Sequence, residues 1–573
     1  MKHLYLSVRV VLAVGLWLAA TGARAQAPAW QSLTTAVVPS GSSSEVAATA
    51  TDAQGNVFIG GTFLGTLTLG TTTLVSTGNY DGFVAKWSPA TNGFVWAQRL
   101  GGSNEDGVSA LAVSGNAVYA AGHFATTATF GTTPLTALGT NGSPDAFVTR
   151  LTDAGSSGSF DWAQRFGGPN ADDAKGLAVT GASVYVAGNF NGPTATFGSF
   201  TLPNNFASFN DIYVVKLTDA GATASVGWVQ SAGGAGEDVA WALAVRGSNV
   251  YVGGLFGGYG PSTHQATFGS TTLAANGNAG DAFVARLTDA GTSGAFSWAV
   301  GAGSNGAETV FGLAVNNSAI YAVGAFSGTT LLLGTVSLPN TGVSNGFVAK
   351  LIDTGTGATA TWGQVVAGAG NTGATKVAVA GSSLYITGSY SGSSASFGTG
   401  SLSNSGASDA FVAKLTDAGG SGSFAWAQGA GGPGSEKGNG VALSGTRVVM
   451  VGEAQPAAQF GSFTVAGAGL GYIPYVATLP DPSITATRSN APGTEVFRVF
   501  PNPAQARATV QLPAGPFPAT LTLLDALGRA VRTQTVDAGA SSATLDLAGL
   551  APGLYAVRVQ AGAATATQRL VVE

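Results

Sequence analysis

Four short apolar segments follow one another between residues 176 and 230: Gly176-Leu-Ala-Val179, Val184-Tyr-Val-Ala-Gly188, Asp211-Ile-Tyr-Val-Val-Lys-Leu217 and Gly227-Trp-Val-Gln230. The third segment alternates with a period of two, which is typical of a half-buried strand. Residues 180–183 and 218–221 read as short turns, and a longer loop carries Ala195-Thr-Phe-Gly198. No part of the chain keeps a 3.6-residue apolar period. We therefore predict an all-β fold of short antiparallel strands.

This four-strand pattern repeats along the chain. The Trp of the fourth segment recurs at Trp30, Trp96, Trp162, Trp228, Trp298, Trp362 and Trp426. Two further series keep the same spacing, namely Phe58, Tyr119, Tyr185, Tyr251, Tyr321, Tyr385 and Val449, and Phe83, Phe147, Tyr213, Phe283, Phe347, Phe411 and Tyr475. Each series has seven members, which predicts a seven-bladed β-propeller over residues 28–480. Because the last repeat lacks its own Trp segment, we expect the strand beside Trp30 to complete it and to close the ring.

Several repeated motifs resemble a known family. They are Asp409-Ala-Phe-Val-Ala-Lys-Leu415, Gly115-Asn116 followed by Val118-Tyr119, and Leu100-Gly-Gly-Ser103. In these motifs the chain is similar to the bacterial seven-bladed β-propeller repeat (SBBP) family. The resemblance implies the propeller fold and says little about function.

The composition excludes several classes of protein. The 573 residues include 87 Gly and no Cys, and charged residues make up 9%. Without Cys there is neither a disulfide framework nor a thiolate metal site. A net charge of −5 argues against nucleic acid as a partner, because the basic footprint is missing.

The N-terminus predicts a secretory signal peptide over residues 1–25. Lys2 and Arg9 precede an apolar run over residues 10–20, and Ala23-Arg24-Ala25 fits a cleavage site after Ala25. The apolar run is too short to span a membrane, and no later segment is a transmembrane candidate.

The repeated pattern of strand segments ends near residue 480. Residues 481–494 read as a linker, and residues 495–573 predict a small antiparallel β-sandwich. This segment resembles the type IX secretion system C-terminal sorting domain, with these matching residues: Pro501, Asn502, Pro503, Asp525, Gly528, Arg529, Gly553 and Tyr555. The resemblance implies the type IX secretion machinery as a partner. It also implies export across the periplasm and outer membrane of a Gram-negative bacterium, with the protein secreted or held at the outer cell surface.

Acidic residues recur just before the first strand of each repeat. The positions are Glu45, Asp106, Asp172, Asp238, Glu308 and Glu436, with Thr372 as the exception. A ring of such acids is a candidate Ca²⁺ site, because Ca²⁺ takes oxygen ligands. The alternative is that each acid accepts hydrogen bonds from its own Gly-rich loop. A second series precedes the third strands, namely Asp81, Asp145, Asp211, Asp281, Asn345 and Asp409, and there we expect a structural role at a turn.

The loop between the second and third strands is longest in the fourth repeat. It carries Tyr259 and His264, and a loop that departs from its repeat is a candidate ligand site. Only two His, His123 and His264, follow the predicted signal peptide, so the Gly342-Val-Ser-Asn-Gly346 match to a hydrolase motif lacks a base. We identify no catalytic residue and no cofactor other than the candidate Ca²⁺.

Three functions remain open at this point. We favour a monomeric, non-enzymatic module that binds a glycan or a protein through one propeller face. The first alternative is a secreted polysaccharide lyase or hydrolase, for which paired carboxylates would supply acid and base. The second alternative is a structural surface repeat without a specific ligand.

Overall fold

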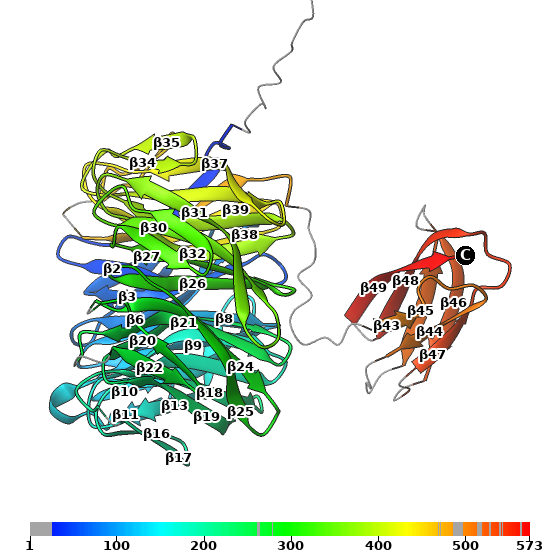
Figure 1. The fold of residues 1–573 in the computed structure, drawn as a ribbon, viewed down its shortest axis with the longest axis horizontal. Helices are drawn as coiled ribbons and strands as arrows, with labels where there is room; N and C mark the ends of the chain where they lie inside the picture. The colour runs from blue at the N-terminus through cyan, green and yellow to red at the C-terminus, as the bar shows by residue number, and fades with distance from the viewer. Residues whose placement is uncertain are drawn as a thin grey trace, which may run out of the picture. The chain divides into compact units, whose positions relative to one another are not determined.

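The computed structural model consists almost entirely of β-strands (Figure 1), which confirms the predicted all-β fold. It describes residues 26–484 and 497–573, apart from 205, 261–263, 278, 468, 470, 513–517, 526–528, 538–539, 541 and 562–563. The predicted signal peptide lies outside the described residues, and the predicted linker is described only as far as residue 484. The chain divides into two compact units, Met1–Ser489 and Asn490–Glu573. Among the described residues, no helix has the length and apolar character that crossing a membrane requires.

The first unit repeats one sheet of four antiparallel strands, paired in the order first, second, third, fourth. Within the described residues we number these sheets as repeats 1 to 7. Their strands are β2 (Ser43–Thr51), β3 (Val57–Leu64), β6 (Asp81–Ser88) and β7 (Gly93–Gly102); β8 (Asp106–Ser114), β9 (Ala117–Phe124), β12 (Asp145–Asp153) and β13 (Gly158–Gly167); β14 (Asp172–Thr180), β15 (Ser183–Phe190), β18 (Asp211–Asp219) and β19 (Ala224–Gly234); β20 (Glu237–Arg246), β21 (Asn249–Gly258), β24 (Asp281–Asp289) and β25 (Gly294–Ala302); β26 (Glu308–Asn316), β27 (Ala319–Phe326), β30 (Asn345–Asp353) and β31 (Ala358–Gly368); β32 (Thr372–Ala380), β33 (Ser383–Tyr390), β36 (Asp409–Asp417) and β37 (Gly422–Ala430); and β38 (Glu436–Ser444), β39 (Arg447–Ala454), β42 (Ile473–Pro480) and β1 (Ser32–Thr35).

The sheets form a propeller-like ring. The first strand of each repeat contacts the first strand of the next, and β38 contacts β2. The fourth position of repeat 7 is filled from the other end of the chain, since β1 pairs with β42 from Ser32↔Thr478 to Thr35↔Tyr475. Trp30, just before β1, is buried and packs edge-on against Phe460 at 5.2 Å between ring centroids. The first strands therefore line a central channel.

Each connection between the second and third strands contains a β-hairpin, which we had predicted as an open loop. The hairpins are β4 (Thr66–Leu69) with β5 (Thr72–Val75), β10 (Thr127–Phe130) with β11 (Thr133–Thr136), β16 (Thr194–Phe197) with β17 (Phe200–Pro203), β22 (Gln265–Phe268) with β23 (Thr271–Ala274), β28 (Thr330–Leu333) with β29 (Val336–Pro339), β34 (Ser394–Phe397) with β35 (Gly400–Ser403), and β40 (Gln459–Phe460) with β41 (Phe463–Thr464). Gly198 turns the third of these hairpins with a φ of +59°, a conformation that favours glycine. Several hairpins extend the preceding repeat, as where β16 pairs with the fourth strand β13. The one short 3-10 helix among the described residues, η1 (Thr140–Gly142), follows β11.

At six of the seven junctions between the described repeats, one largely buried aspartate joins consecutive repeats. Asp417, at the end of β36, accepts hydrogen bonds from Trp362 Nε1 at 3.0 Å and Tyr321 Oη at 2.7 Å. It also forms an ion pair with Lys350 Nζ at 2.7 Å. The aspartates with equivalent pairs to the previous repeat are Asp153, Asp219, Asp289, Asp353 and Asp481. The Trp series is therefore packed between repeats rather than exposed to a ligand.

The second unit is a pair of facing antiparallel sheets. One sheet contains β43 (Arg498–Phe500), β44 (Arg507–Gln511) and β47 (Ser542–Asp546), and the other contains β45 (Ala519–Leu524), β46 (Ala530–Val536), β48 (Gly553–Ala561) and β49 (Ala564–Val572). Val510, Leu521, Leu545, Val557 and Leu570 are buried in one common core. This unit therefore has its own hydrophobic core.

Candidate functional site

The acids predicted as a Ca²⁺ ring are buried inside their own loops. Asp106 accepts backbone hydrogen bonds from Gly102 at 2.7 Å and Ala125 at 3.1 Å, and Asp172 accepts them from Gly168 and Asn191. Asp238, Glu308 and Glu436 likewise accept backbone N–H groups. The described residues contain no group of three or more His, Cys, Asp or Glu that is placed to hold a metal ion. The five acids thus do not converge on one ion, and calcium binding stays a prediction.

Glu45 does not occupy the position that we predicted for it. The register pairs Ser44 with Phe63, as it pairs Asp106 with Phe124 and Asp172 with Phe190. Ser44 is therefore the equivalent residue, and Glu45 is exposed on the opposite side of β2. A single residue of misalignment in a period-2 strand moves a side chain to the other face.

Burial changes the ionisation of these acids. Burial raises the pKa of Asp106 to about 7 and that of Asp172 to about 8, against the opposing hydrogen bonds from backbone N–H groups. It also raises the pKa of Glu436 to about 7. Because Asp106, Asp172, Asp238, Glu308 and Glu436 are at most 2% exposed, none of them reaches a polysaccharide in this conformation.

The side chains on the channel wall differ between repeats at the β-bulge of the first strand and at the residue that follows it. Each first strand carries a β-bulge, and the residues left unpaired there are Ala47, Ser109, Lys175, Trp241, Phe311, Thr375 and Asn439. The next residue is Gly or Ala in every repeat except repeat 6, where it is Lys376. A small residue is needed where strands crowd the axis, since a Cβ on Gly176 would lie 2.7 Å from the Leu243 Cβ. Lys376 is thus a specific departure from the pattern.

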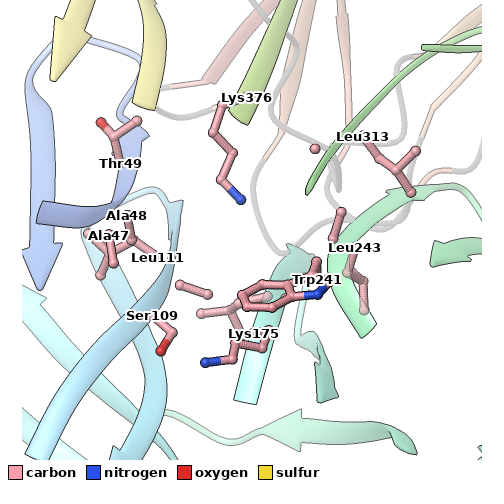
Figure 2. A pocket seen from close by; sticks show the side chains of 15 residues that line it. Ala47, Ala48, Thr49, Ser109, Leu111, Lys175, Trp241, Leu243, Leu313 and Lys376 are labelled. Atoms are coloured by element: carbon pink, nitrogen blue, oxygen red, sulfur yellow. The ribbon is translucent and has the colours of Figure 1, made fainter. Parts of the chain in front are cut away.

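Lys376 and several of the unpaired bulge residues surround one cavity. The cavity measures about 150 Å³ and is lined by first-strand residues, among them Thr49, Ser109, Lys175, Trp241 and Lys376. Figure 2 shows Lys376 and Trp241 projecting toward the same open space from different parts of the wall. Two buried polar atoms here have no hydrogen-bond partner, namely Trp241 Nε1 and Thr49 Oγ1. A ligand with both acceptors and donors would satisfy them.

Positive charge gathers on this wall. The Lys175 ammonium lies 5.1 Å from the Trp241 ring centroid and pairs with Asp173, which also lies 3.7 Å from His123 Nδ1. Lys376 Nζ donates to the Phe311 carbonyl at 3.1 Å. Of the lysines in the described residues, only Lys376 has no carboxylate within ion-pair distance. Burial, followed by the charge of Lys175, lowers the pKa of Lys376 to about 8.

The predicted ligand residues of the fourth repeat lie beside β21. Tyr259 is 75% exposed, and the Nδ1 of half-buried His264 lies 3.1 Å from the Gly257 carbonyl. Other exposed apolar side chains follow in the same connections of neighbouring repeats, namely Leu138, Phe206 and Val343. Exposed apolar residues therefore occur in these connections in several repeats, with Val75 as a further example in repeat 1.

Most of the predicted sorting residues are placed within the second unit. Asn502 lies between Pro501 and Pro503, and it bonds β49 by donating to the Arg569 carbonyl and accepting from Val571 N–H. Asp525 accepts from the Arg529 backbone N–H and from its guanidinium. Gly553 begins β48, and Tyr555 donates to the Ala551 carbonyl at 2.9 Å. Gly528 lies outside the described residues.

Comparison with known proteins identifies this unit. Residues 498–573 match the family model described as "Secretion system C-terminal sorting domain". The domain indicates export to the cell surface or secretion, so the predicted localisation is confirmed. The secretion machinery is the partner that it implies.

The repeats have more distant relatives. The curated "Regulatory protein FlaEY" of Caulobacter vibrioides is 28% identical over 311 residues, which are 51% of this chain and 30% of that protein. The chain therefore spans about a third of that relative's length. A protein of unknown function from Dyadobacter fermentans shares 10% identity at a TM-score of 0.32 over 78% of this chain and 99% of that one. The endosialidase of phage phi92 shares 9% identity at a TM-score of 0.34 over 94% of this chain and 87% of that one.

The prediction that the protein is not an enzyme is wrong. One similar solved structure, the endosialidase of phage phi92, is an enzyme. At a TM-score of 0.34 this likeness assigns no activity to the present chain, and turnover has to be measured directly.

The channel residues were not predicted from the sequence. We had aligned the repeats on their shared aromatic residues, and Lys175, Trp241 and Lys376 differ from one repeat to the next. A signal was available, because Lys376 alone interrupts a column of Gly and Ala.

Proposed function

We propose that this chain is an exported seven-bladed β-propeller of the SBBP type that binds an acidic glycan at its central channel. Within it, residues 28–480 form the ring and residues 495–573 form the sorting domain. The ordering of the four-stranded sheets and the pairing of β1 with β42 support the seven-bladed, N-terminally closed ring.

One observation carries the glycan-binding proposal: the channel wall places Lys376, Lys175 and Trp241 around one cavity, and Lys376 stands where the other repeats have Gly or Ala. A ligand carboxylate would accept hydrogen bonds from the ammonium groups of Lys175 and Lys376 and from the indole N–H of Trp241. The sugar ring would pack on the aromatic side chains, as in other sites where few polar groups stand among apolar ones. Uronic and sialic acids combine these two features.

The outer face supports the same function. Leu138, Phe206, Tyr259 and Val343 are exposed on the connections between second and third strands of repeats 2 to 5. Tyr259 combines an apolar ring with a polar hydroxyl, a combination that is enriched at binding interfaces. In this proposal Tyr259 and His264 contact glycan units beyond the one in the channel.

Binding is tested by calorimetric titration of the purified chain with oligogalacturonate and with a neutral oligosaccharide of equal length. The acidic ligand is expected to bind, and Lys376→Met to weaken it at least tenfold. Arg246→Ala is the matched control, because it removes one positive charge from the exposed end of the first strand β20. Equal binding of both ligands, or equal losses in the two variants, would refute the proposal.

A second candidate function, cleavage of the same glycan, is favoured by the chemistry of Lys376. An amine whose pKa is about 8 is partly neutral near neutral pH and can accept a proton. In a lyase reaction it would take the proton from the carbon beside the uronate carboxylate, while Lys175 balances the carboxylate charge. The neighbouring C–O bond then breaks, a carbon–carbon double bond forms, and the departing oxygen takes up a proton. Ultraviolet absorbance of the unsaturated product in the same samples separates binding from turnover.

A further inference from the structure

The acids at the start of the first strands and the acids at the start of the third strands meet at the junctions between repeats. The backbone N–H of each first-strand acid donates to the carbonyl just before the third-strand acid of the preceding repeat. The distance is 2.7 Å for Asp106 to Tyr80, beside Asp81, and 2.8 Å for Glu436 to Ser408, beside Asp409. The resulting pairs are Asp81 with Asp106, Asp145 with Asp172, Asp211 with Asp238, Asp281 with Glu308, and Asp409 with Glu436.

The acids occur together or not at all. At the junction of repeats 5 and 6, the same backbone bond joins Thr372 to Ser344, and the paired side chains are Asn345 and Thr372. At the junction of repeats 7 and 1, Ser44 N–H donates to the Tyr472 carbonyl, beside Ile473. Within the described residues, no junction keeps one acid and loses the other. The two carboxyl groups therefore act as a unit.

Two of the five pairs have an arginine. Arg99 lies 2.5 Å from Asp81, and Arg165 lies 3.6 Å from Asp145. These arginines hold equivalent positions on the fourth strands, opposite Phe83 and Phe147. In the other three pairs the equivalent residues are Ser231, Gly301 and Gly429. Among the described residues, no basic side chain forms an ion pair with the acids of these three junctions.

Unpartnered oxygen atoms gather at the three junctions without arginine. Buried oxygens with no hydrogen-bond partner are Asp211 Oδ1, Asp238 Oδ2, Asp281 Oδ1, Asp409 Oδ1 and Glu436 Oε1. Asp81 Oδ1 is the one further example from the paired acids. Asp238, Asp281, Asp409 and Glu436 are each at most 2% exposed. Two adjacent ionised carboxylates without a counter-charge are costly to bury, so each of these junctions is stabilised by a bound cation or by a shared proton.

We propose that the pairs Asp211–Asp238, Asp281–Glu308 and Asp409–Glu436 each bind one Ca²⁺ ion. The ion occupies the role that Arg99 and Arg165 fill at the first two junctions. Carboxylate oxygens are hard ligands, and Ca²⁺ is a large, geometrically tolerant cation whose coordination backbone carbonyl oxygens and water can complete. Calcium thereby links consecutive repeats and stabilises the ring.

Metal content tests this proposal independently of glycan binding. The purified full chain is stripped with a chelator, dialysed against CaCl₂ at pH 8, and analysed for bound metal. Three Ca²⁺ per chain are expected, with a rise in melting temperature of roughly 5 °C or more over the stripped protein. Asp409→Asn with Glu436→Thr copies the neutral pair Asn345 and Thr372, so this double variant is expected to fold and to bind two.

The matched control is Asp81→Asn with Asp106→Thr, at a junction that has an arginine, and it is expected to retain three ions. A chain without bound metal, whose melting temperature falls from pH 6 to pH 9 with or without calcium, would overturn the proposal in favour of a proton shared by each pair. An unchanged metal count in the Asp409/Glu436 variant would place the ions elsewhere. If that variant does not fold, the metal count of the unmodified chain decides.

Discussion

Single aspartates hold the repeats together. Asp417 receives an indole N–H, a phenol O–H and an ammonium group from repeat 5, and the backbone N–H of Gly419 also donates to it at 2.9 Å. The bonds from Lys350, Tyr321 and Trp362 keep the pKa of Asp417 below its usual range, although burial alone would raise it. The same carboxylate thus satisfies three buried donors of the neighbouring sheet.

Asp417→Ala is therefore expected to destabilise the ring by about 3 kcal/mol, because it leaves the buried Lys350 ammonium without its partner. Urea denaturation measures this change. Glu105→Ala, at an exposed acid, is the control and is expected to stay within about 0.5 kcal/mol of the unmodified chain. Equal stability of the two variants would contradict the role of Asp417.

Glu453 predicts a dependence of stability on pH. Burial raises its pKa from 4.5 to about 7, although Lys437 and the Val46 N–H act in the opposite direction. The folded state therefore favours the protonated form, and stability falls as the pH rises from about 4.5 to about 7. In Glu453→Gln this fall should be smaller by up to roughly 3 kcal/mol, as measured by denaturation at pH 5 and pH 8. Identical pH profiles for the two proteins would refute the assignment.

At the residue scale, the side chains that recur in every repeat could be predicted from the sequence, and the side chains that differ between repeats could not. The Trp series identified the repeats, and in the structure Trp362 of this series donates to Asp417 between repeats. Lys376 was not predicted because the repeats were aligned on their shared aromatic residues. The pairing of the two acid series was not predicted because it depends on which strands meet across a junction. Glu45 was misassigned by one residue for the same reason, since register is set by pairing and not by spacing.

Among the elements, the strands were predictable and the hairpins were not. Alternation and turn residues identified the segments around Val184 and Asp211, which form β15 and β18. The hairpin of β16 and β17 was read as a loop because its strands have only four residues each. Such short strands gain stability from pairing with another sheet, as β16 does with β13.

The pairing of strand β1 with β42 predicts that the N-terminal strand is needed to close and stabilise the ring. A chain that lacks residues 26–35 loses the burial of Trp30 and leaves the edge of β42 unpaired. We expect a loss of at least about 3 kcal/mol and self-association through the open edge, measured by denaturation and size-exclusion chromatography. A synthetic peptide of residues 26–36 should restore the stability when it is added. Unchanged stability without the peptide would contradict closure by β1.

For the whole molecule, the ring and the sorting domain are separate units with separate cores. The sorting domain was predictable because its short motifs occur in a fixed order. The ligand of the ring was not predictable, because it depends on side chains from several repeats that meet only when the ring closes.

Removal of residues 498–573 is therefore expected to abolish export while the ring still folds. Cell fractionation should find the truncated chain retained inside the cell, whereas the full chain reaches the surface or the medium. A reporter fused to residues 490–573 provides the reciprocal control and should be exported. Export of the truncated chain would contradict the assignment.

The central claim is that an acidic glycan binds in the channel, and an experimental structure of the purified chain with saturating oligogalacturonate tests it most directly. We expect a ligand carboxylate between Lys175 and Lys376, with its sugar ring against Trp241. A ligand seated only on the outer loops around Tyr259, or an empty channel at saturation, would contradict it.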